Sequence, residues 1–375
     1  MRISVAREHD GEPRVAATPE TVKKMKGLGA EVVVEPGAGV QSGILDADYA
    51  TAGATVATNG AGGADVVLKV RRPSDAELGA YKPGALVMAI MDPYGNDAAL
   101  AAMAKAGITA FAMELLPRIT RAQTMDVLSS QANLAGYRAV IDAAAEYGRA
   151  LPMMMTAAGT VPAAKVFVMG AGVAGLQAIA TARRLGAVVT ATDVRPAAKE
   201  QVESLGAKFI AVEDEEFKQA ETAAGYAKEM SKEYQAKQAA LVADHIKKQD
   251  IVVTTALIPG RPAPRLISHD MVASMRPGSV IVDLAVERGG NVEGAQADRV
   301  AEVSGVKIIG TSNPTRLPAS ASNLYARNLL AFLEILIDKK TKALAVNWDD
   351  DIVKATALTR DGAVVHKNFL PKTAA

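Results

Sequence analysis

The chain has 375 residues and a mass of 38.9 kDa, which is enough for two domains of ordinary size. Its 42 Lys and Arg residues balance 41 Asp and Glu residues, so we expect no broad charged surface for nucleic acid or an anionic membrane. The absence of cysteine excludes disulfides, zinc–thiolate sites, iron–sulfur clusters and thiol nucleophiles. None of the four histidines stands at a metal-ligand spacing from another, and we predict no metal site.

No segment predicts a membrane span or a signal peptide. The longest stretch without a charged residue runs from Val166 to Ala182, contains three glycines, and is shorter than the ~20 apolar residues of a transmembrane helix. The N-terminus lacks the long apolar region of a signal peptide. We therefore expect a soluble, cytoplasmic protein.

The first third of the chain alternates short apolar runs with helical patterns. Strands are predicted at Ile3–Ala6, Glu31–Glu35, Val66–Val70, Ala85–Ile90 and Ile108–Met113. Helices are predicted at Pro19–Leu28, Asp46–Ala52, Ser74–Ala80 and Asn96–Ala106. Such alternation favours a doubly wound parallel sheet, and Thr18 is a good N-cap for the first helix.

The same alternation returns after a long helical stretch. Further strands are predicted at Val166–Met169, Val188–Thr192, Phe209–Val212, Ile251–Thr255, Val280–Leu284 and Lys307–Ile309. We predict two Rossmann-like α/β domains joined by long helices. Their segments are residues 1–125 with 335–375, a linking helix at 126–150, a hairpin at 151–164, the second domain at 165–315 and a second linking helix at 316–337.

The charged segment Glu213–Gln249 is too long for an ordinary connection between a helix and a strand. One interpretation is a solvated surface helix. The other is a flexible element, centred on Thr222–Tyr226, that closes over a binding site. The sequence leaves both open.

A glycine-rich turn follows the first strand of the second domain. Gly170, Gly172 and Gly175 form G-A-G-V-A-G, between a buried strand and the helical pattern Leu176–Leu185. In this motif the glycines permit a tight turn, close approach of a pyrophosphate and close packing of helix on strand. The next strand ends at Asp193, where a carboxylate can accept hydrogen bonds from the adenosine ribose and repel a 2′-phosphate. The pattern predicts NAD(H) rather than NADP(H), although the nearby Arg195 could accommodate a phosphate.

Longer segments identify a resemblance. They are Pro117–Asp126, Leu128–Arg138, Pro152–Pro162, Thr192–Arg195, Lys199–Gly206 and Thr254–Gly260. Over nearly its whole length the chain resembles the soluble NAD(H)-binding alpha subunit of proton-translocating NAD(P) transhydrogenase, in the form found where the alpha polypeptide is split in two. That family is related to alanine dehydrogenase. The resemblance implies that NAD(H) lies in the cleft between the two domains.

The resemblance also assigns residues. It places the nicotinamide end of NAD(H) at Arg118, Ile119, Thr120, Gln123, Thr124, Met125, Asp126 and Ser129, with Arg118, Gln123 and Asp126 as the catalytic set. It places the glycine turn at Val173, the adenosine ribose at Asp193, Val194 and Arg195, and the closing side of the cleft at Gly225, Tyr226 and Leu257. Without the resemblance, Arg118 and Asp126 could equally form a surface ion pair.

The resemblance implies a homodimer clasped by the methionine-rich hairpin, together with two partners. These are a transhydrogenase beta subunit that binds NADP(H) and a second, membrane-spanning alpha subunit, which would make this chain peripheral to the inner (cytoplasmic) membrane. Hydride transfer between two nicotinamides needs alignment but no acid or base. Only one glycine fingerprint is present, so the second nucleotide must lie on a partner.

An alanine dehydrogenase-like amino-acid dehydrogenase is the main alternative. Arg14 matches the position that binds the substrate carboxylate in that enzyme, but the proton-handling Lys and His positions hold Arg71 and Asp92 here. Arginine stays protonated near pH 7 and cannot serve as a general acid–base. Lys69 lies close by in sequence and keeps the alternative open. A non-catalytic NAD sensor is a third possibility.

Overall fold

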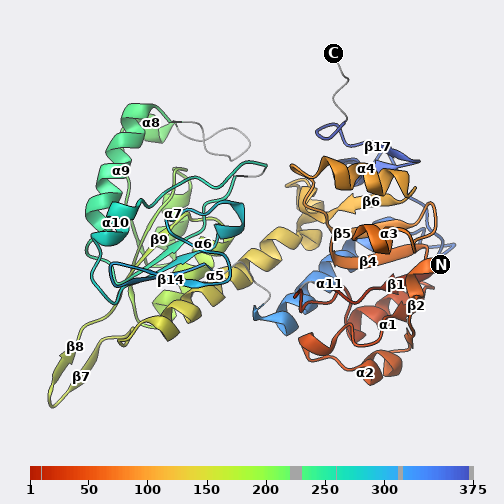
Figure 1. The fold of residues 1–375 in the computed structure, drawn as a ribbon, viewed down its shortest axis with the longest axis horizontal. Helices are drawn as coiled ribbons and strands as arrows, with labels where there is room; N and C mark the ends of the chain where they lie inside the picture. The colour runs from red at the N-terminus through yellow and green to blue at the C-terminus, as the bar shows by residue number, and fades with distance from the viewer. Residues whose placement is uncertain (10, 220–229, 259, 311–315, 371–375) are drawn as a thin grey trace. The chain divides into compact units, whose positions relative to one another are not determined.

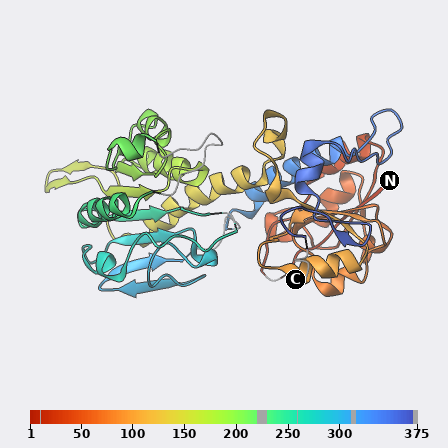
Figure 2. The same ribbon diagram turned by 90° about the horizontal axis from the view of Figure 1, so that it is seen from above.

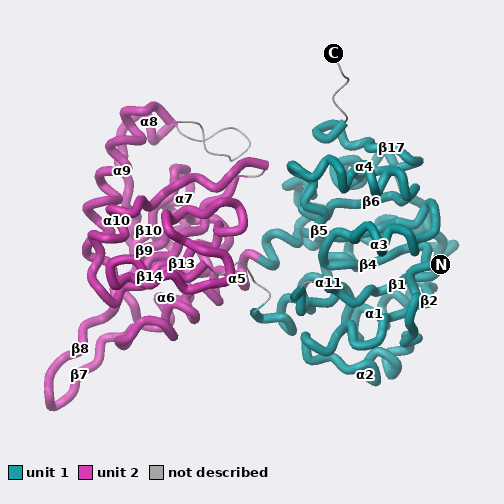
Figure 3. The backbone as a smooth tube through the Cα atoms, in the orientation of Figure 1, with its two compact units in different colours: residues 1–131, 315–375 teal, residues 132–314 magenta. Residues whose placement is uncertain are grey.

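The computed structural model describes residues 1–9, 11–219, 230–258, 260–310 and 316–370. The chain divides into two compact units (Figure 3). Unit 1 comprises Met1–Gln131 and Thr315–Ala375, and unit 2 comprises Ala132–Pro314. Each unit contains one largely parallel sheet with helices on both faces, which confirms the predicted pair of Rossmann-like domains.

The sheet of unit 1 has six parallel strands in the order β3-β2-β1-β4-β5-β6 (Figure 1). The strands are β1 (Arg2–Val5), β2 (Glu31–Val34), β3 (Thr55–Val56), β4 (Val66–Arg71), β5 (Leu86–Ile90) and β6 (Thr109–Ala112). The order reverses between β1 and β4, which is the switch point where such sheets bind ligands. Five strands match predicted ones, and β3 is too short to produce a sequence pattern.

The helices of unit 1 lie before, between and after these strands. They are α1 (Pro19–Gly27), α2 (Asp46–Thr51), α3 (Asp75–Leu78), α4 (Asp97–Lys105), α11 (Pro318–Ile335) and α12 (Asp351–Thr356), with short 3-10 turns η1 (Val40–Ser42), η2 (Gly60–Gly63), η3 (Met113–Leu115) and η4 (Thr120–Met125). Two short strands near the C-terminus, β16 (Thr359–Arg360) and β17 (Ala363–Val364), form an antiparallel pair. The N-cap of α1 is Thr18, as predicted, and its hydroxyl accepts from the backbone of Thr21.

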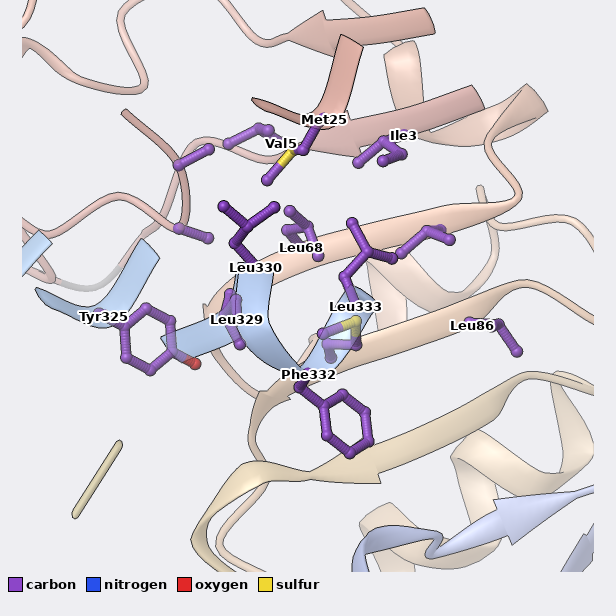
Figure 4. Packing of buried hydrophobic residues seen from close by; sticks show 14 of the residues in the cluster. Ile3, Val5, Met25, Leu68, Leu86, Tyr325, Leu329, Leu330, Phe332 and Leu333 are labelled. Atoms are coloured by element: carbon purple, nitrogen blue, oxygen red, sulfur yellow. The ribbon is translucent and has the colours of Figure 1, made fainter. Parts of the chain in front are cut away.

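Alternate strand residues of unit 1 belong to two separate cores. Leu68 and Leu86 pack with Met25 of α1 and Leu329 of α11 on one face (Figure 4). Val67, one residue away on β4, packs in the other cluster with residues of α3 and α4. Successive strand residues point to opposite faces, so these apolar runs are buried on both sides.

The sheet of unit 2 has seven strands in the order β11-β10-β9-β12-β13-β15-β14, and only β14 is antiparallel. The strands are β9 (Lys165–Met169), β10 (Val188–Thr192), β11 (Lys208–Phe209), β12 (Ile251–Thr254), β13 (Val280–Asp283), β14 (Val300–Val303) and β15 (Val306–Ile309). The helices are α6 (Val173–Arg184), α7 (Ala198–Ser204), α8 (Glu215–Lys218), α9 (Lys232–Ile246) and α10 (His269–Ala273), with the 3-10 turn η5 (Val286–Arg288). Helix α5 (Val127–Glu146) begins in unit 1 and continues into unit 2.

A two-stranded hairpin extends from unit 2. It pairs β7 (Met154–Thr156) with β8 (Gly159–Val161) and projects away from the sheet of its unit (Figures 1 and 2). Met153, Met154 and Met155 are 61%, 43% and 79% exposed. These methionines therefore contribute nothing to the core of the chain that carries them.

The charged segment Glu213–Gln249 is partly helical. Helix α9 packs Val242 and Ile246 against the sheet of unit 2, so it is an integral helix with one buried face. The centre of the expected closing element, Thr222–Tyr226, lies outside the described residues, and its closure stays a prediction.

Candidate functional site

The glycine turn of unit 2 connects β9 to α6, and each glycine meets different surroundings. Gly170 has φ +100°, and a Cβ there would lie 2.6 Å from Thr255 Oγ1. A Cβ on Gly175 would lie 1.8 Å from the Gly170 carbonyl oxygen, so only glycine fits. A Cβ on Gly172 would meet nothing within 4 Å. The protein therefore needs glycine at 170 and 175 to fold, whereas position 172 leaves an open space.

That open space fits a dinucleotide. Gly172 is the N-cap of α6 and provides no side-chain hydrogen bond to the first turn of the helix. The unpaired N–H groups and positive end of a helix favour a phosphate. The residues present thus match what the pyrophosphate of NAD(H) requires.

The acid at the end of β10 is held at this turn. Asp193 Oδ2 accepts from the backbone N–H of Ala171 at 2.7 Å, and Oδ1 accepts from the backbone N–H of Arg195 at 2.9 Å. The guanidinium of Arg195 folds back onto the same carboxylate, at 2.9 Å from Nε to Oδ1 and 3.0 Å from Nη2 to Oδ2. The predicted ribose acceptor and the predicted phosphate acceptor are thus joined in one ion pair.

Exposed apolar side chains lie next in sequence to these groups. Val173 is 40% exposed, Val194 47% and Leu257 54%. All three were assigned to the cofactor from sequence, and their exposure leaves them able to contact a planar base or ring. The other two residues of the expected closing side, Gly225 and Tyr226, lie outside the described residues.

Three residues that support the turn could not be singled out from sequence. Thr255 donates its hydroxyl to the Gly170 carbonyl at 3.0 Å. Buried Asn291 holds the loop after β12, accepting from Ala256 N at 3.1 Å and donating to Ala256 O at 2.9 Å. A Cβ on Gly136 of α5 would lie 1.9 Å from a carbonyl of α6, so the helices touch there. Only the isolated glycine inside a helical pattern gave a signal.

In unit 1 the segment assigned to the nicotinamide forms η4 and the start of α5. Arg118, Ile119, Thr120, Gln123 and Thr124 are exposed. Met125 is only 4% exposed and packs in the unit 1 core, so its side chain anchors the segment. A cofactor contact at that position would fall to its backbone.

Asp126 serves as a helix cap in this structure. It directly precedes α5, and its Oδ1 accepts from the backbone N–H of Ser129 at 2.9 Å. Its Oδ2 accepts from the Ser129 hydroxyl at 2.6 Å. Two residues assigned to the cofactor therefore bind one another and fix the first turn of α5.

A charged cluster occupies the switch point of the unit 1 sheet. Buried Arg14 binds Glu12 through two hydrogen bonds of 2.7 Å, and Arg71 Nε lies 2.9 Å from the same carboxylate. Although burial raises the pKa of Glu12, its hydrogen bond with Arg14 outweighs this and holds that pKa below the ordinary value. Lys69 is 1% exposed and pairs with Glu8 at 3.5 Å and with a second glutamate. The lysine that kept amino-acid chemistry open is thus a buried, ion-paired residue.

Some features were searched for only among the described residues. Within the ranges given above, no group of three or more His, Asp or Glu side chains could hold a metal ion. Over the same ranges, no helix has both the length and the apolar character needed to cross a membrane.

The doubly wound sheet, the glycine turn and the acid after the second strand define a Rossmann-like nucleotide-binding protein. Comparison with known families is more specific. The alanine dehydrogenase/PNT N-terminal domain matches residues 4–135, and the C-terminal domain of the same family matches residues 139–367. The chain belongs to the alanine dehydrogenase/PNT family.

Within this family the chain is most informatively compared with three proteins. It is 57% identical to the first of the two polypeptides of NAD(P) transhydrogenase subunit alpha from Rhodospirillum rubrum, over 98% of each chain. A crystal structure of transhydrogenase from Sinorhizobium meliloti matches at 66% identity with a TM-score of 0.90, over 97% of this chain and 100% of that one. L-alanine dehydrogenase matches at 26% identity with a TM-score of 0.82, over 98% of both chains. The resemblance to the transhydrogenase alpha subunit is confirmed.

Proposed function

We propose that this chain is the NAD(H)-binding subunit of a proton-translocating transhydrogenase. The observation that carries the proposal is the glycine turn of unit 2, with open space at Gly172 and the carboxylate of Asp193 fixed beside it. The high identity to a transhydrogenase alpha subunit supports the assignment of that site to NAD(H). NAD(H) supplies a nicotinamide ring that donates or accepts a hydride.

The residues of this chain divide the nucleotide between them. Gly170, Gly172, Val173 and Gly175 hold the pyrophosphate, and residues 193–195 hold the adenosine ribose. Residues 118–129 orient the nicotinamide, and Arg118, Gln123 and Asp126 contact it directly. These side chains bind and align, because hydride transfer between two nicotinamides at C4 transfers no net proton.

Partners complete the reaction. NADP(H) binds a beta subunit, a second, membrane-spanning alpha subunit completes the complex, and hydride transfer is coupled to proton movement across the membrane. The name of the Rhodospirillum rubrum relative describes one portion of a divided alpha subunit, which supports a complex of several subunits. In this proposal the chain is a homodimer that lies at the cytoplasmic face of the inner membrane, and the exposed methionines of the β7–β8 hairpin clasp the second copy.

An alanine dehydrogenase-like activity is the second candidate, because that enzyme shares the fold at 26% identity. The charged cluster of unit 1 argues against it. Buried Lys69 is ion-paired with glutamates, and Arg71, at the position expected for a proton-transferring lysine, is bound to Glu12. Neither group is suited to move a proton near pH 7.

A deuterium-transfer assay tests the proposal. The purified chain alone should bind NADH but should not oxidise it with NADP⁺, nor with pyruvate plus ammonia. Adding an NADP(H)-binding partner domain should start turnover, and deuterium from 4-deuterated NADH should appear in NADPH. Loss of the label to water, or substantial turnover by the chain alone, would refute the proposal.

A further inference from the structure

The segment that carries the proposed nicotinamide-binding residues has little regular backbone support of its own. It consists of the 3-10 turn η4, followed by the capped start of α5. Its local backbone bonds include Ala122 N to Ile119 O at 3.0 Å and Asp126 N to Gln123 O at 3.3 Å. Since 3-10 geometry forms weaker hydrogen bonds than an α-helix, the shape of this segment depends on what holds it from outside.

One side chain holds both ends of the segment. Asn328, on α11 and 8% exposed, donates from Nδ2 to the Thr124 carbonyl at 2.8 Å. Its Oδ1 accepts from the Ser130 hydroxyl at 2.7 Å. A backbone carbonyl can only accept, so the amide nitrogen must face Thr124 and the orientation of the amide is fixed. We propose that Asn328 is a positioning residue for nicotinamide binding, a role that rests on the proposed function.

The two bonds lie beside the residues that matter. Thr124 is one residue after Gln123 and two before Asp126, whereas Ser130 follows Ser129. Asn328 thereby sets the distance between the carbonyl near the end of η4 and the first turn of α5. The carboxylate of Asp126 lies between these two attachment points in the chain.

The helix that carries Asn328 is itself firmly anchored. Leu329 and Tyr325 are fully buried in the unit 1 core, and the Tyr325 hydroxyl donates to the Lys69 carbonyl at 2.9 Å. A second bond reinforces the junction, because Gln131 donates from Nε2 to the Ala321 carbonyl of α11 at 3.2 Å. Helix α11 thus provides a rigid surface on which Asn328 fixes an otherwise weakly supported turn.

Replacing Asn328 should impair recognition of the nicotinamide but not of the adenosine half. We compare the affinity for NADH with that for ADP-ribose, which lacks the nicotinamide. Asn328→Ala should lower the preference for NADH about three- to tenfold, as expected from loss of one or two buried hydrogen bonds, and leave ADP-ribose binding unchanged. Asn328→Asp should do no better, because it puts a negatively charged oxygen against the Thr124 carbonyl.

Ser322→Ala is the matched control. Ser322 is also buried on α11, but its hydroxyl accepts from Val15 N at 3.0 Å and lies 2.8 Å from Ser42 Oγ. This variant should lower the melting temperature without changing the NADH preference. Ser130→Ala, which removes only one of the two bonds, should lower the preference less than Asn328→Ala and provides the test if that variant does not fold.

The outcomes separate this inference from the proposed function. If the unmodified chain prefers NADH to ADP-ribose and Asn328→Ala keeps that preference, the positioning role is wrong. An equal loss in Ser322→Ala would also overturn it, because general destabilisation would then explain the effect. If the unmodified chain shows no preference for NADH, the assignment of residues 118–129 to the nicotinamide fails instead.

Discussion

Asp126 has two separable roles, as a helix cap and as a proposed contact to the nicotinamide. Its carboxylate accepts from Ser129 N at 2.9 Å and Ser129 Oγ at 2.6 Å. Asp126→Ala removes both bonds, and loss of an N-cap costs about 0.5–2 kcal/mol. For a unit of this size that lowers the melting temperature by roughly 2–6 °C. Asp126→Asn keeps an oxygen for Ser129 N and loses only the favourable charge at the helix N-terminus, about 0.3–1 kcal/mol.

The pair of variants therefore separates stability from catalysis. Asp126→Asn should regain most of the stability that Asp126→Ala loses. If the charge orients the nicotinamide, both variants should slow partner-dependent hydride transfer by at least about tenfold, a loss of ~1.4 kcal/mol, and weaken NADH binding less.

The measurements are thermal unfolding, NADH titration and hydride transfer with an NADP(H)-binding partner domain. Arg118→Ala is the companion variant, since this exposed residue caps no helix and its loss should slow transfer without lowering stability. The reasoning is refuted if Asp126→Asn transfers hydride at the full rate, because Asp126 would then act only as a cap. Normal binding and transfer by Arg118→Ala would show that its assignment is wrong as well.

Three further predictions concern the turn, the cofactor and the hairpin. Gly172→Ala should fold normally by circular dichroism yet lose NADH affinity, whereas Gly175→Ala should fail to fold, because its Cβ would lie 1.8 Å from a carbonyl oxygen; NADH binding unchanged in Gly172→Ala would remove the pyrophosphate from the turn. The chain should bind NADH at least ~10-fold tighter than NADPH in a fluorescence titration. Asp193→Ala should narrow that gap, because it releases Arg195 to accept the 2′-phosphate; a constant ratio would contradict this. Met155→Glu, at a side chain 79% exposed, should leave the melting of the monomer unchanged but shift a dimer toward monomer in sedimentation, and an unshifted dimer would exclude the hairpin as its clasp.

Local patterns were sufficient to predict the two sheets. Each strand buried on both faces reads as a continuous apolar run, and the strand–turn–helix context of Gly170–Gly175 marks the phosphate-binding turn. Such signals lie within a few residues of one another, so they are legible without the fold. Strand β14 escaped prediction because its side chains alternate between exposed and half-buried at the sheet edge, which leaves no apolar run.

Contacts between distant segments could be seen only in the tertiary structure. Asn328 meets Thr124 across 204 positions of sequence, and Asn291 meets Ala256 across 35. An asparagine in a helical pattern predicts nothing by itself, because its amide has no partner until the chain folds. Likewise, Lys69 read as a candidate proton donor until the fold enclosed it with Glu8 and Glu77. The sequence determined which residue types are present and where the turns fall, and only folding decided which polar groups are paired with one another and which remain exposed to a ligand.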